Sequence, residues 1–390
     1  MVSDSPSTPN VACGPIVGIS TDVIEAIGAK GGLDGIGIYT EALFGNLAKC
    51  GVTLKSVASP RPGRINHAKA RRPDLTFGLP LPVAISLGAL AHVKTFGSAR
   101  VERAIDLYHA TNYMVPRLAC TPVVATVYDA IPLAQPQWAN QRLRGLKNWL
   151  LRNSIRNADR VIAISEAGRE EIISHYRVAR ERTRVIPLGI EEAWFNPPDV
   201  DITAQILNKR NLDRGYFLFV GTLQPRKNIG MLLDAYERLP ANLRAERQLV
   251  IVGKYGWNAE DVRHRLERAQ ISGRCVWLNY VPREELRHIY AAAGAFVFPS
   301  LAEGFGLPVL EALASGLPVV ASDLPALREV SGSHAFYVRP GDAAALTDAL
   351  TAVDTVDPVA DSATERRAHA ARFSWSACAA RTVDVYRELW

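Results

Sequence analysis

The sequence predicts an α/β protein of two doubly wound domains, each built on a parallel sheet, that face one another across a cleft. Short β-branched runs alternate with segments of helical pattern along the chain, which is the order of βαβ units. The chain has 390 residues, which is too long for one ordinary core and fits two or three domains. The pattern breaks near the middle, at residues 189–198, and leaves two halves of similar content.

Six strands are predicted in each half. They lie near residues 16–20, 53–58, 105–110, 123–128, 160–165 and 185–188 in the first half, and near 216–221, 248–253, 275–279, 295–299, 319–322 and 335–338 in the second. The junction, GIEEAWFNPP, carries prolines that stop a helix, so we place one domain in residues 1–195 and the other in 196–373. The carboxyl ends of both sets of strands then face the cleft, where open α/β sheets bind ligands.

The composition is that of a folded protein with a modest positive charge. Apolar residues make up 48% and charged residues 22%, which is near the globular average. The net charge of +6 favours an anionic partner without naming it. Because the basic residues are spread out and no nucleic-acid motif is present, we do not expect that partner to be nucleic acid.

Cysteine usage and hydropathy indicate a cytoplasmic protein. The five cysteines are scattered, with no close pairing and no zinc spacing, which is typical of reduced thiols. The N-terminus, MVSDSPSTPN, lacks the basic and apolar regions of a signal peptide. The longest apolar run, residues 79–93, is interrupted by Pro80 and Pro82 and is shorter than the ~20 residues of a membrane span. We expect nothing here to cross a bilayer.

The stretch FPSLAEGFGLPVLEALASG, residues 298–316, predicts an anion site. It reads as a strand end, a glycine loop with Glu303, and a helix opened by a proline with Glu311 in its first turn. Proline suits a helix start because its missing N–H would be unpaired there, so the amides of Gly306 and Leu307 would point outward at the positive end of the helix. Such an end binds phosphate. The alternative is an ordinary glycine loop of a doubly wound domain.

A basic pair, Arg226 and Lys227, follows the strand predicted near 216–221 and precedes a helix. At the carboxyl end of a strand, this pair would neutralise a diphosphate, because Arg can bind two phosphate oxygens at once and Lys adds a compact charge. The alternative is an exposed pair of solvated side chains.

Polar residues also end strands of the first half. His109 could hydrogen-bond a sugar hydroxyl, or it could be a buried histidine satisfied by the backbone. Asp129, in TVYDAIPL, occupies a similar place after the next strand. The run GGLDGIGIYT fits either a simple turn or a phosphate or acceptor contact through Gly35 and Gly37. It does not match the dinucleotide fingerprint, because the third glycine is missing.

The stretch at residues 298–316, in which seven residues separate Glu303 from Glu311, resembles the donor-site signature of the retaining glycosyltransferases of family 4. The glycine loop, the strand-end histidine, the PLGI junction, the basic pair and the last helix follow in that family's order, so the resemblance covers nearly the whole chain. It implies a GT-B fold of two facing Rossmann-like domains, in which the last helix, residues 374–390, returns to the first domain.

The resemblance implies transfer of a sugar from a nucleoside diphosphate to a hydroxyl acceptor, with retention at the anomeric carbon and without a metal or other cofactor. It implies that Glu311 binds the ribose and that Glu303 binds sugar hydroxyls. The residues expected to act in catalysis are His109, Asp129, Arg226, Lys227 and Glu303. The residues expected to bind the donor are Gly35, Gly37, Thr222, Arg226, Lys227, Lys254, Tyr280, Val281, Ser300, Glu303, Gly304, Phe305, Gly306, Leu307 and Glu311.

Two positions depart from the family pattern. Thr222 stands where many members carry an arginine, so we expect Arg226 to take that role. Tyr128 precedes Asp129 where a histidine is common, and we place Asp129 on the acceptor side. Lys254, Tyr280 and Val281 would frame the base of the donor, and packing is an equally good explanation for such strand-end residues.

The segments HATNY, TVYDAIPL and GTLQPRKN are most similar to bacterial mannosyl- and rhamnosyltransferases of surface polysaccharide assembly. This similarity favours GDP-mannose as donor and a growing, lipid-linked glycan as acceptor. A UDP- or dTDP-linked sugar, or a GT-B nucleotide-sugar epimerase, are the alternatives.

Two basic stretches lie in the first half. Residues 61–72 are expected to form a mobile loop. Residues 141–160 are expected to form an amphipathic helix with Leu143, Leu146, Leu150 and Ala158 toward the core. Such a helix is either a solvated face or, if the acceptor is lipid-linked, a peripheral contact with an anionic cytoplasmic membrane surface.

Overall fold

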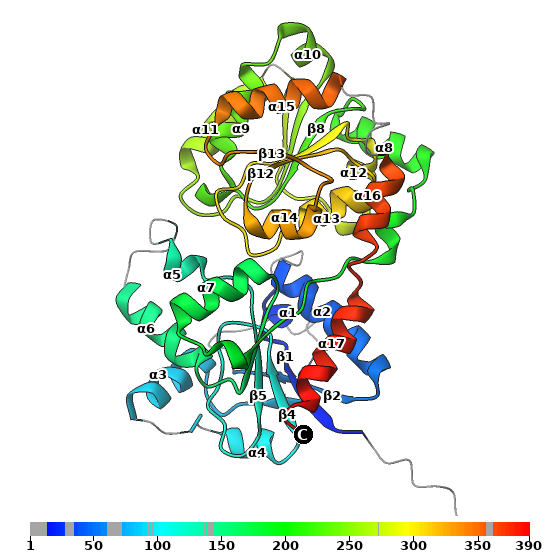
Figure 1. The fold of residues 1–390 in the computed structure, drawn as a ribbon. Helices are drawn as coiled ribbons and strands as arrows, with labels where there is room; N and C mark the ends of the chain where they lie inside the picture. Colours follow the sequence, from blue (N-terminus) through cyan, green and yellow to red (C-terminus); the bar gives the residue numbers. More distant parts are fainter. Residues whose placement is uncertain are drawn as a thin grey trace, which may run out of the picture.

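The computed structural model shows two α/β domains, one above the other in Figure 1, connected by two segments of chain. It describes residues 14–27, 35–60, 72–91, 94–95, 97–135, 138, 144–271, 273–355 and 362–390. Each domain is a parallel sheet covered by helices, which confirms the predicted fold class.

The described residues of the first domain form a seven-stranded parallel sheet in the order β3-β2-β1-β4-β5-β6-β7. The order reverses between β1 and β4, so the carboxyl ends of these two strands form the switch point where such sheets bind ligands. The strands are β1 (Ile16–Ser20), β2 (Thr53–Ala58), β3 (Leu75–Thr76), β4 (Leu107–Ala110), β5 (Val123–Val127), β6 (Arg160–Ala163) and β7 (Thr183–Val185). The helices are α1 (Asp22–Ile27), α2 (Gly35–Leu47), α3 (Leu81–Ala91), α4 (Ser98–Glu102), α5 (Ile131–Ala134), α6 (Arg144–Ile155) and α7 (Glu166–Tyr176).

The second domain repeats this plan with a six-stranded parallel sheet among its described residues, in the order β10-β9-β8-β11-β12-β13. Its switch point lies between β8 and β11. The strands are β8 (Phe217–Val220), β9 (Leu249–Val252), β10 (Cys275–Leu278), β11 (Ala295–Phe298), β12 (Val319–Ser322) and β13 (Phe336–Val338). The helices are α8 (Val200–Arg210), α9 (Ile229–Glu237), α10 (Ala241–Glu246), α11 (Glu260–Gln270), α12 (Arg283–Ala292), α13 (Leu307–Ala314), α14 (Pro325–Ser331), α15 (Ala343–Thr355) and α16 (Ala363–Ala370), followed by α17 (Trp375–Arg387).

Two strands differ from the sequence prediction. β3 was not predicted, because two residues carry no readable periodicity. The strand predicted at residues 185–188 lies at Thr183–Val185 instead. Ile186 and Leu188 leave the sheet but still bury their side chains, which explains why this stretch reads as a strand.

The two segments that join the domains run side by side. The amide of Ile190 donates to the carbonyl oxygen of Phe373 at 3.1 Å. A Cβ at Gly189 would lie 2.2 Å from the backbone nitrogen of Trp375, so only glycine allows this approach. The second segment leads into α17, which packs against α2 on the first domain (Figure 1).

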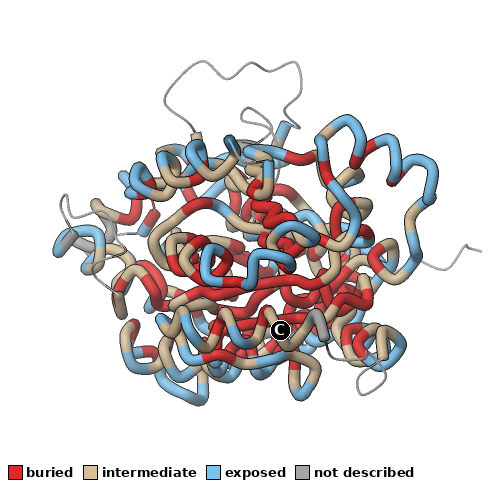
Figure 2. Tube along the Cα trace, turned by 90° about the horizontal axis from the view of Figure 1, so that it is seen from above, coloured by how far each residue is buried: buried red, intermediate tan, exposed pale blue. Residues whose placement is uncertain are grey.

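The core follows the strands, as the buried residues along the middle of Figure 2 show. One hydrophobic cluster fills the second domain and continues between the first sheet and helices α2 and α17. A second cluster fills the opposite face of the first sheet, under α3, α6 and α7. Among the residues described, no helix is both long enough and apolar enough to cross a membrane.

The basic amphipathic helix predicted at residues 141–160 is shorter and differently oriented. It forms α6, and its C-terminal end is anchored in the core by Ile155, with Ala158 buried just beyond. Leu146 was expected to face the core but is 52% exposed. The helix packs through its C-terminal half, which leaves its N-terminal half at the surface. Most of the predicted basic loop, residues 61–71, lies outside the described residues.

Candidate active site

The candidate site lies at the switch point of the second sheet. Because β8 and β11 are neighbours in the sheet, the loops that follow them lie together at its carboxyl edge. The amide of Leu301, in the β11–α13 loop (residues 299–306), donates to the carbonyl oxygen of Arg226 at 2.7 Å. The predicted basic pair and the first predicted glutamate therefore meet, although more than seventy residues separate them in sequence.

Glu303 forms ion pairs with both members of the basic pair. Its Oε1 lies 2.6 Å from Nζ of Lys227, and its Oε2 lies 2.9 Å from Nη1 of Arg226. The side chains of Glu303 and Lys227 are each only 8% exposed. Arg226 also donates to the carbonyl oxygen of Ala302, and Lys227 Nζ lies 4.3 Å from the ring centroid of Phe298. The pair is thus held rigidly and is not a solvated surface pair.

The three side chains of this cluster are charged at pH 7. Burial alone would raise the pKa of Glu303, but the charges of Lys227 and Arg226 outweigh it and lower the pKa to about 2. Burial lowers the pKa of Lys227 to about 8, against the pull of Glu303. Both cations and the carboxylate are therefore charged at pH 7. The cluster carries one net positive charge in a poorly solvated place, which suits an anion.

Helix α13 begins beside this cluster and carries the second predicted glutamate. Gly306 forms its N-cap with φ of 112°, a backbone conformation that glycine adopts without strain. The helix starts at Leu307, one residue before Pro308. Glu311 was expected in the first turn but lies in the second turn. Tyr290 donates from its hydroxyl to Oε2 of Glu311 at 3.2 Å, and burial raises the pKa of Glu311 to about 7.

The first domain contributes Asp129 to the same region. Its Oδ1 accepts hydrogen bonds from the Tyr113 hydroxyl and the Ile131 amide, each at 3.1 Å. Burial raises the pKa of the Asp129 carboxyl above its usual value, while the charge of Arg226 across the cleft opposes this shift. Asp129 and Arg226 both line a cavity of about 610 Å³ that lies between the domains. The strand-end position predicted for Asp129 therefore does face the second domain.

The cavity between the domains is also lined by residues that were not among the predicted site residues. Tyr113, Trp138, Asn148 and Gln224 bring aromatic and hydrogen-bonding groups to it, and Trp257 faces it from the second domain. Such a lining suits a sugar, which offers apolar ring faces and hydroxyl edges. A lone tryptophan in a loop carries no sequence pattern that would distinguish it from packing.

His109 is placed differently from the prediction. It lies within β4 and is fully buried. Its Nδ1 lies 2.6 Å from the Tyr386 hydroxyl and its Nε2 lies 2.9 Å from the Thr126 hydroxyl, which is in turn 2.8 Å from the hydroxyl of Tyr39. Burial lowers the pKa of His109 to about 3, so the ring is neutral. The expectation that it lines the cleft is wrong for this structure, because its side chain faces α17 rather than the cleft.

The glycines predicted to approach the donor belong to a helix. Gly35 opens α2 and is exposed, whereas Gly37 lies inside its first turn and is buried. The preceding residues of this predicted loop, 31–34, lie outside the described residues. Only Gly35 of this pair is therefore on the surface, and Ile36 beside it lines the cavity between the domains.

The other predicted donor residues lie around the carboxyl edge of the second sheet. Thr222, after β8, is exposed. Nζ of Lys254, after β9, lies 4.7 Å from the ring centroid of the half-exposed Tyr280, after β10. Val281 is buried, so its side chain packs in the core and only its backbone could meet a base.

Ser300, Gly304 and Phe305 lie within the β11–α13 loop. The buried hydroxyl of Ser300 has no hydrogen-bond partner with good geometry. Phe305 is buried and packs edge-on against Phe373, with their ring centroids 6.1 Å apart. Phe305 therefore anchors the loop, and its side chain does not reach into the cleft.

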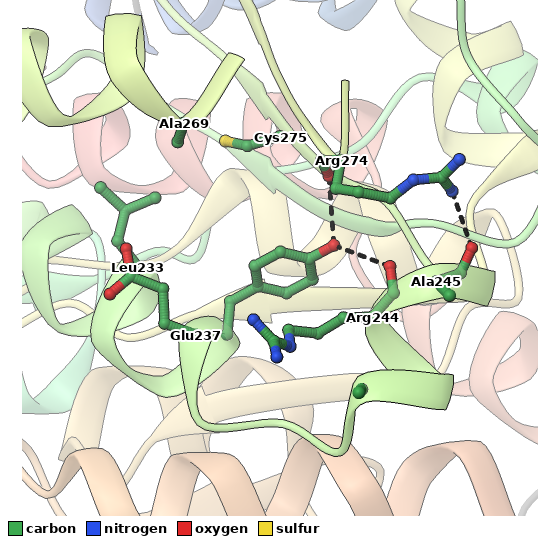
Figure 3. A pocket seen from close by; sticks show the side chains of 9 residues that line it. Leu233, Glu237, Arg244, Ala245, Ala269, Arg274 and Cys275 are labelled. Atoms are coloured by element: carbon green, nitrogen blue, oxygen red, sulfur yellow. Dashed lines mark hydrogen bonds between the residues drawn. The ribbon is translucent and has the colours of Figure 1, made fainter. Parts of the chain in front are cut away.

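A second cavity lies at the other edge of the second sheet (Figure 3). It has a volume of about 370 Å³ and lies beside the amino end of β10, where Cys275 begins that strand. Burial raises the pKa of the Cys275 thiol to about 12, so the thiol is unreactive. The Tyr236 hydroxyl lies 2.7 Å from the Arg247 carbonyl oxygen and 3.1 Å from that of Arg274, which makes it a structural tie.

Within the described residues, no cluster of three or more histidine, cysteine, aspartate or glutamate side chains could hold a metal ion.

Both halves of the chain match family models. Residues 33–194 match "Glycosyltransferase Family 4", and residues 203–366 match "Glycosyl transferases group 1". The chain is 32% identical to O-antigen chain mannosyltransferase B of Escherichia coli over 79% of this chain and 81% of the relative. It is 30% identical to alpha-maltose-1-phosphate synthase of Mycobacterium tuberculosis over 91% of this chain and 95% of the relative.

The fold also matches that of solved structures. Sucrose-phosphate synthase from Thermosynechococcus elongatus superposes with a TM-score of 0.72 at 23% identity and covers 96% of this chain and 99% of its own. Together with the sequence matches over both halves, this likeness makes the chain a member of the family 4, group 1 glycosyltransferases with the GT-B fold.

Proposed function

We propose that this glycosyltransferase moves mannose from GDP-mannose to a hydroxyl of a lipid-linked surface glycan, with retention at the anomeric carbon. The observation that carries the proposal is the buried ion cluster in which Glu303 lies between Lys227 and Arg226, beside the N-terminus of α13. In this proposal the second domain, residues 196–373, binds the donor. The first domain, residues 1–195 completed by 374–390, binds the acceptor.

Lys227 and Arg226 offset the charge that develops on the leaving diphosphate. As the bond between sugar and phosphate breaks, negative charge builds on the phosphate oxygens, and preorganised cations stabilise it strongly in a site with little water. The positive end of α13 adds to this field through the amide at Leu307. With two cations and a helix end available, the reaction needs no metal, and we propose that it uses none.

The two glutamates position the donor. Glu303 accepts hydrogen bonds from sugar hydroxyls near the reacting carbon, and its low pKa keeps it an acceptor throughout the neutral range. Glu311 accepts from the ribose hydroxyls, with Tyr290 fixing its carboxylate. No residue here is assigned as a nucleophile. The acceptor attacks on the same face that the phosphate leaves, and the leaving phosphate oxygen takes the proton of the acceptor hydroxyl.

Asp129 orients the acceptor. It lies across the cavity from Arg226, and its carboxylate is already held by Tyr113 and by the Ile131 amide. A fixed carboxylate at this place can accept a hydrogen bond from an incoming sugar hydroxyl without losing entropy when the acceptor binds. The aromatic groups of Trp138 and Trp257 would contact the apolar faces of the acceptor sugar.

The choice of mannose is supported by relatives and not by the geometry. The E. coli relative is named as an O-antigen chain mannosyltransferase, whereas the mycobacterial relative carries a different activity at similar identity. A UDP- or dTDP-linked donor and a nucleotide-sugar epimerase of the same fold are therefore outcomes of the test below.

The surface of α6 supports a peripheral contact with an anionic cytoplasmic membrane. Leu146 and Trp149 are 52% and 39% exposed, and Lys147 beside them is exposed too. Val83 on α3, which packs against α6, is 48% exposed. Exposed apolar side chains next to basic ones are the composition of helices that lie on anionic lipid. This surface would bring a lipid-linked acceptor to the first domain.

The donor is tested by incubating the purified protein with GDP-mannose, UDP-glucose, UDP-N-acetylglucosamine and dTDP-rhamnose in turn, with EDTA present. We expect thermal stabilisation and slow release of GDP with GDP-mannose alone. Release of a nucleoside diphosphate with another donor would show that the proposed donor is wrong. Conversion of the sugar without release of the diphosphate would show that the protein is an epimerase. Abolition of turnover by EDTA that Mg²⁺ restores would refute the metal-free mechanism.

The membrane contact is tested by sedimentation with vesicles that contain phosphatidylglycerol, at low salt. We expect binding that Leu146→Ser with Trp149→Ser weakens and that high salt removes. Val200→Ser is the matched control, because Val200 is 70% exposed on α8 of the second domain. Equal sedimentation of the double variant and the wild type would refute the proposed surface.

A further inference from the structure

The two domains touch at the N-terminal end of α7, close to the candidate site. Helix α14 of the second domain packs against α7 of the first. Glu329 of α14 accepts a hydrogen bond from the Glu166 amide with Oε2 and one from the Ala167 amide with Oε1, both at 2.7 Å. The first amides of a helix have no partner inside the helix and form its positive end, so a carboxylate from the opposite domain is stabilised there.

Ser165 joins the same contact to the active-site loop. It is the N-cap of α7, and its hydroxyl accepts a hydrogen bond from the Gly168 amide at 2.9 Å. The same hydroxyl donates to the carbonyl oxygen of Gly304 in the second domain at 2.8 Å. Ser165 is 1% exposed, so this bond is shielded from water. The Ser165 side chain thus caps the N-terminus of a helix in the first domain and hydrogen-bonds the backbone directly after Glu303 in the second domain.

The loop backbone is also seated tightly against the first domain. A Cβ at Gly304 would lie 2.2 Å from the carbonyl oxygen of Tyr128 and 3.1 Å from Cβ of Asp129. Only glycine lets the loop approach this closely. The β11–α13 loop is therefore in contact with the end of β5 as well as with the start of α7.

We propose that Ser165 and Glu329 are positioning residues that couple closure of the two domains to the placement of Glu303. The ion pairs with Lys227 and Arg226 hold the Glu303 carboxylate from within the second domain. Its backbone, by contrast, is held by Ser165 across the domain interface, and Glu329 holds that interface together. Transfer is then fast only while the domains are closed. The inference rests on the proposed role of Glu303 in sugar binding.

Kinetic measurements on Ser165→Ala and Glu329→Ala test the coupling. With GDP-mannose as donor, we expect kcat to fall about tenfold to a hundredfold in each variant, because a displaced binding group slows the chemical step. The Kd for free GDP, measured by calorimetry, should stay within about twofold, since the proposed nucleotide contacts lie inside the second domain. Ser165→Thr keeps the hydroxyl and should retain most of the rate.

Two controls separate coupling from local stability. Ser362→Ala removes the N-cap of α16, which receives the Glu365 amide within the second domain. Glu170→Gln removes an acid of α7 that pairs with Arg180 and Arg169 of its own domain. Both should leave kcat within about twofold of the wild type. An equal fall of kcat in the controls would overturn the coupling.

Hydrogen exchange of the ligand-free protein gives a readout that needs no donor. We expect amides of residues 301–306 to exchange faster in Glu329→Ala, although Glu329 bonds to α7 and not to this loop. Unchanged exchange there, or faster exchange with an unchanged kcat in both variants, would overturn the proposal. Faster exchange in a series where even the wild type does not use GDP-mannose would support the coupling and refute only the proposed donor.

Discussion

The two switch points of this protein share one strand order but present different chemistry. In the second sheet, the loops after β8 and β11 bring Arg226, Lys227 and Glu303 into one charged cluster. In the first sheet, His109 occupies the corresponding strand β4 but is neutral, buried and hydrogen-bonded to hydroxyls of the core. The same topology therefore yields a charged cluster facing the cleft at one switch point and a buried polar network at the other.

The difference comes from where each residue lies relative to the end of its strand. Glu303 follows the last residue of β11, Phe298, in a loop, so its side chain is free of the layers that cover the sheet. His109 precedes the last residue of β4, Ala110. Because successive side chains of a strand point to opposite faces of the sheet, its direction is set by the strand. Its side chain points to the face that α17 covers. In this fold a polar side chain reaches the cleft when its residue follows the end of the strand, and not when it lies within the strand.

The largest effect is expected from Lys227→Ala. Because this cation offsets charge on the leaving diphosphate, we expect kcat to fall by about 10²–10³ while the fold is kept, since Arg226 still pairs with Glu303. Release of the nucleoside diphosphate measures kcat, and circular dichroism checks the fold. Lys209→Ala, at an exposed position of α8, is the control. Normal turnover of the Lys227→Ala protein would remove the role proposed for the whole cluster.

At the first switch point, a substitution should lower stability and leave kcat unchanged. His109→Ala leaves a small void, unpairs the Tyr386 hydroxyl and leaves the Thr126 hydroxyl with Tyr39 as its partner, so we expect a loss of about 3 kcal/mol in the free energy of unfolding. At a temperature where the variant is folded, kcat should stay near the wild-type value. Urea unfolding and transfer assays measure the two quantities, with the exposed His264→Ala as control. Full stability with a strong fall in kcat would show that His109 reaches the substrate.

Much of this arrangement could be predicted from sequence, because the observations concerned were local. The strand alternation, the glycine loop and the position of the basic pair after a strand are all readable along one stretch of chain, and they place Glu303 with Lys227 correctly. The orientation of His109 could not be predicted in the same way. It depends on α17, which lies more than 260 residues away in sequence and supplies Tyr386.

The contact between the domains could not be predicted from the sequence either. Ser165 reads as a helix cap, and Glu329 reads as one more exposed acid on a short helix. Their partners, Gly304 and the amides of α7, are defined only once the two domains are placed together. Sequence periodicity describes how each element packs in its own domain and carries no information about a pairing of this kind.

The two glutamates of the second site differ in their partners. Glu303 forms ion pairs with Lys227 and Arg226, whereas the buried Glu311 accepts a hydrogen bond from the neutral Tyr290 hydroxyl. Its pKa of about 7 lies above the ordinary 4.5, so the folded state binds its proton more tightly than the unfolded state does. Its contribution to stability is therefore fully present below about pH 4.5 and is lost as the pH rises through 7.

Between pH 5 and 8, the wild type should accordingly lose about 2 kcal/mol more unfolding free energy than Glu311→Gln does. The glutamine is neutral and can still accept from Tyr290, which makes it the matched variant. Urea unfolding at four pH values in this range measures the difference. Parallel curves for the two proteins would mean that Glu311 is ionised at all of them.

The smallest effect is expected from Tyr386→Phe, which removes one hydroxyl from the buried network of the first switch point. The His109 ring then keeps Thr126 as a partner but loses the bond at Nδ1. We expect a loss of about 1 kcal/mol in stability and no change in kcat, because the altered atom lies between the sheet and α17. The same substitution in a His109→Ala background should cost less, since the partner is already gone. Additive losses in the double variant would show that the two side chains are not coupled, and the contrast between the two switch points would then rest on burial alone.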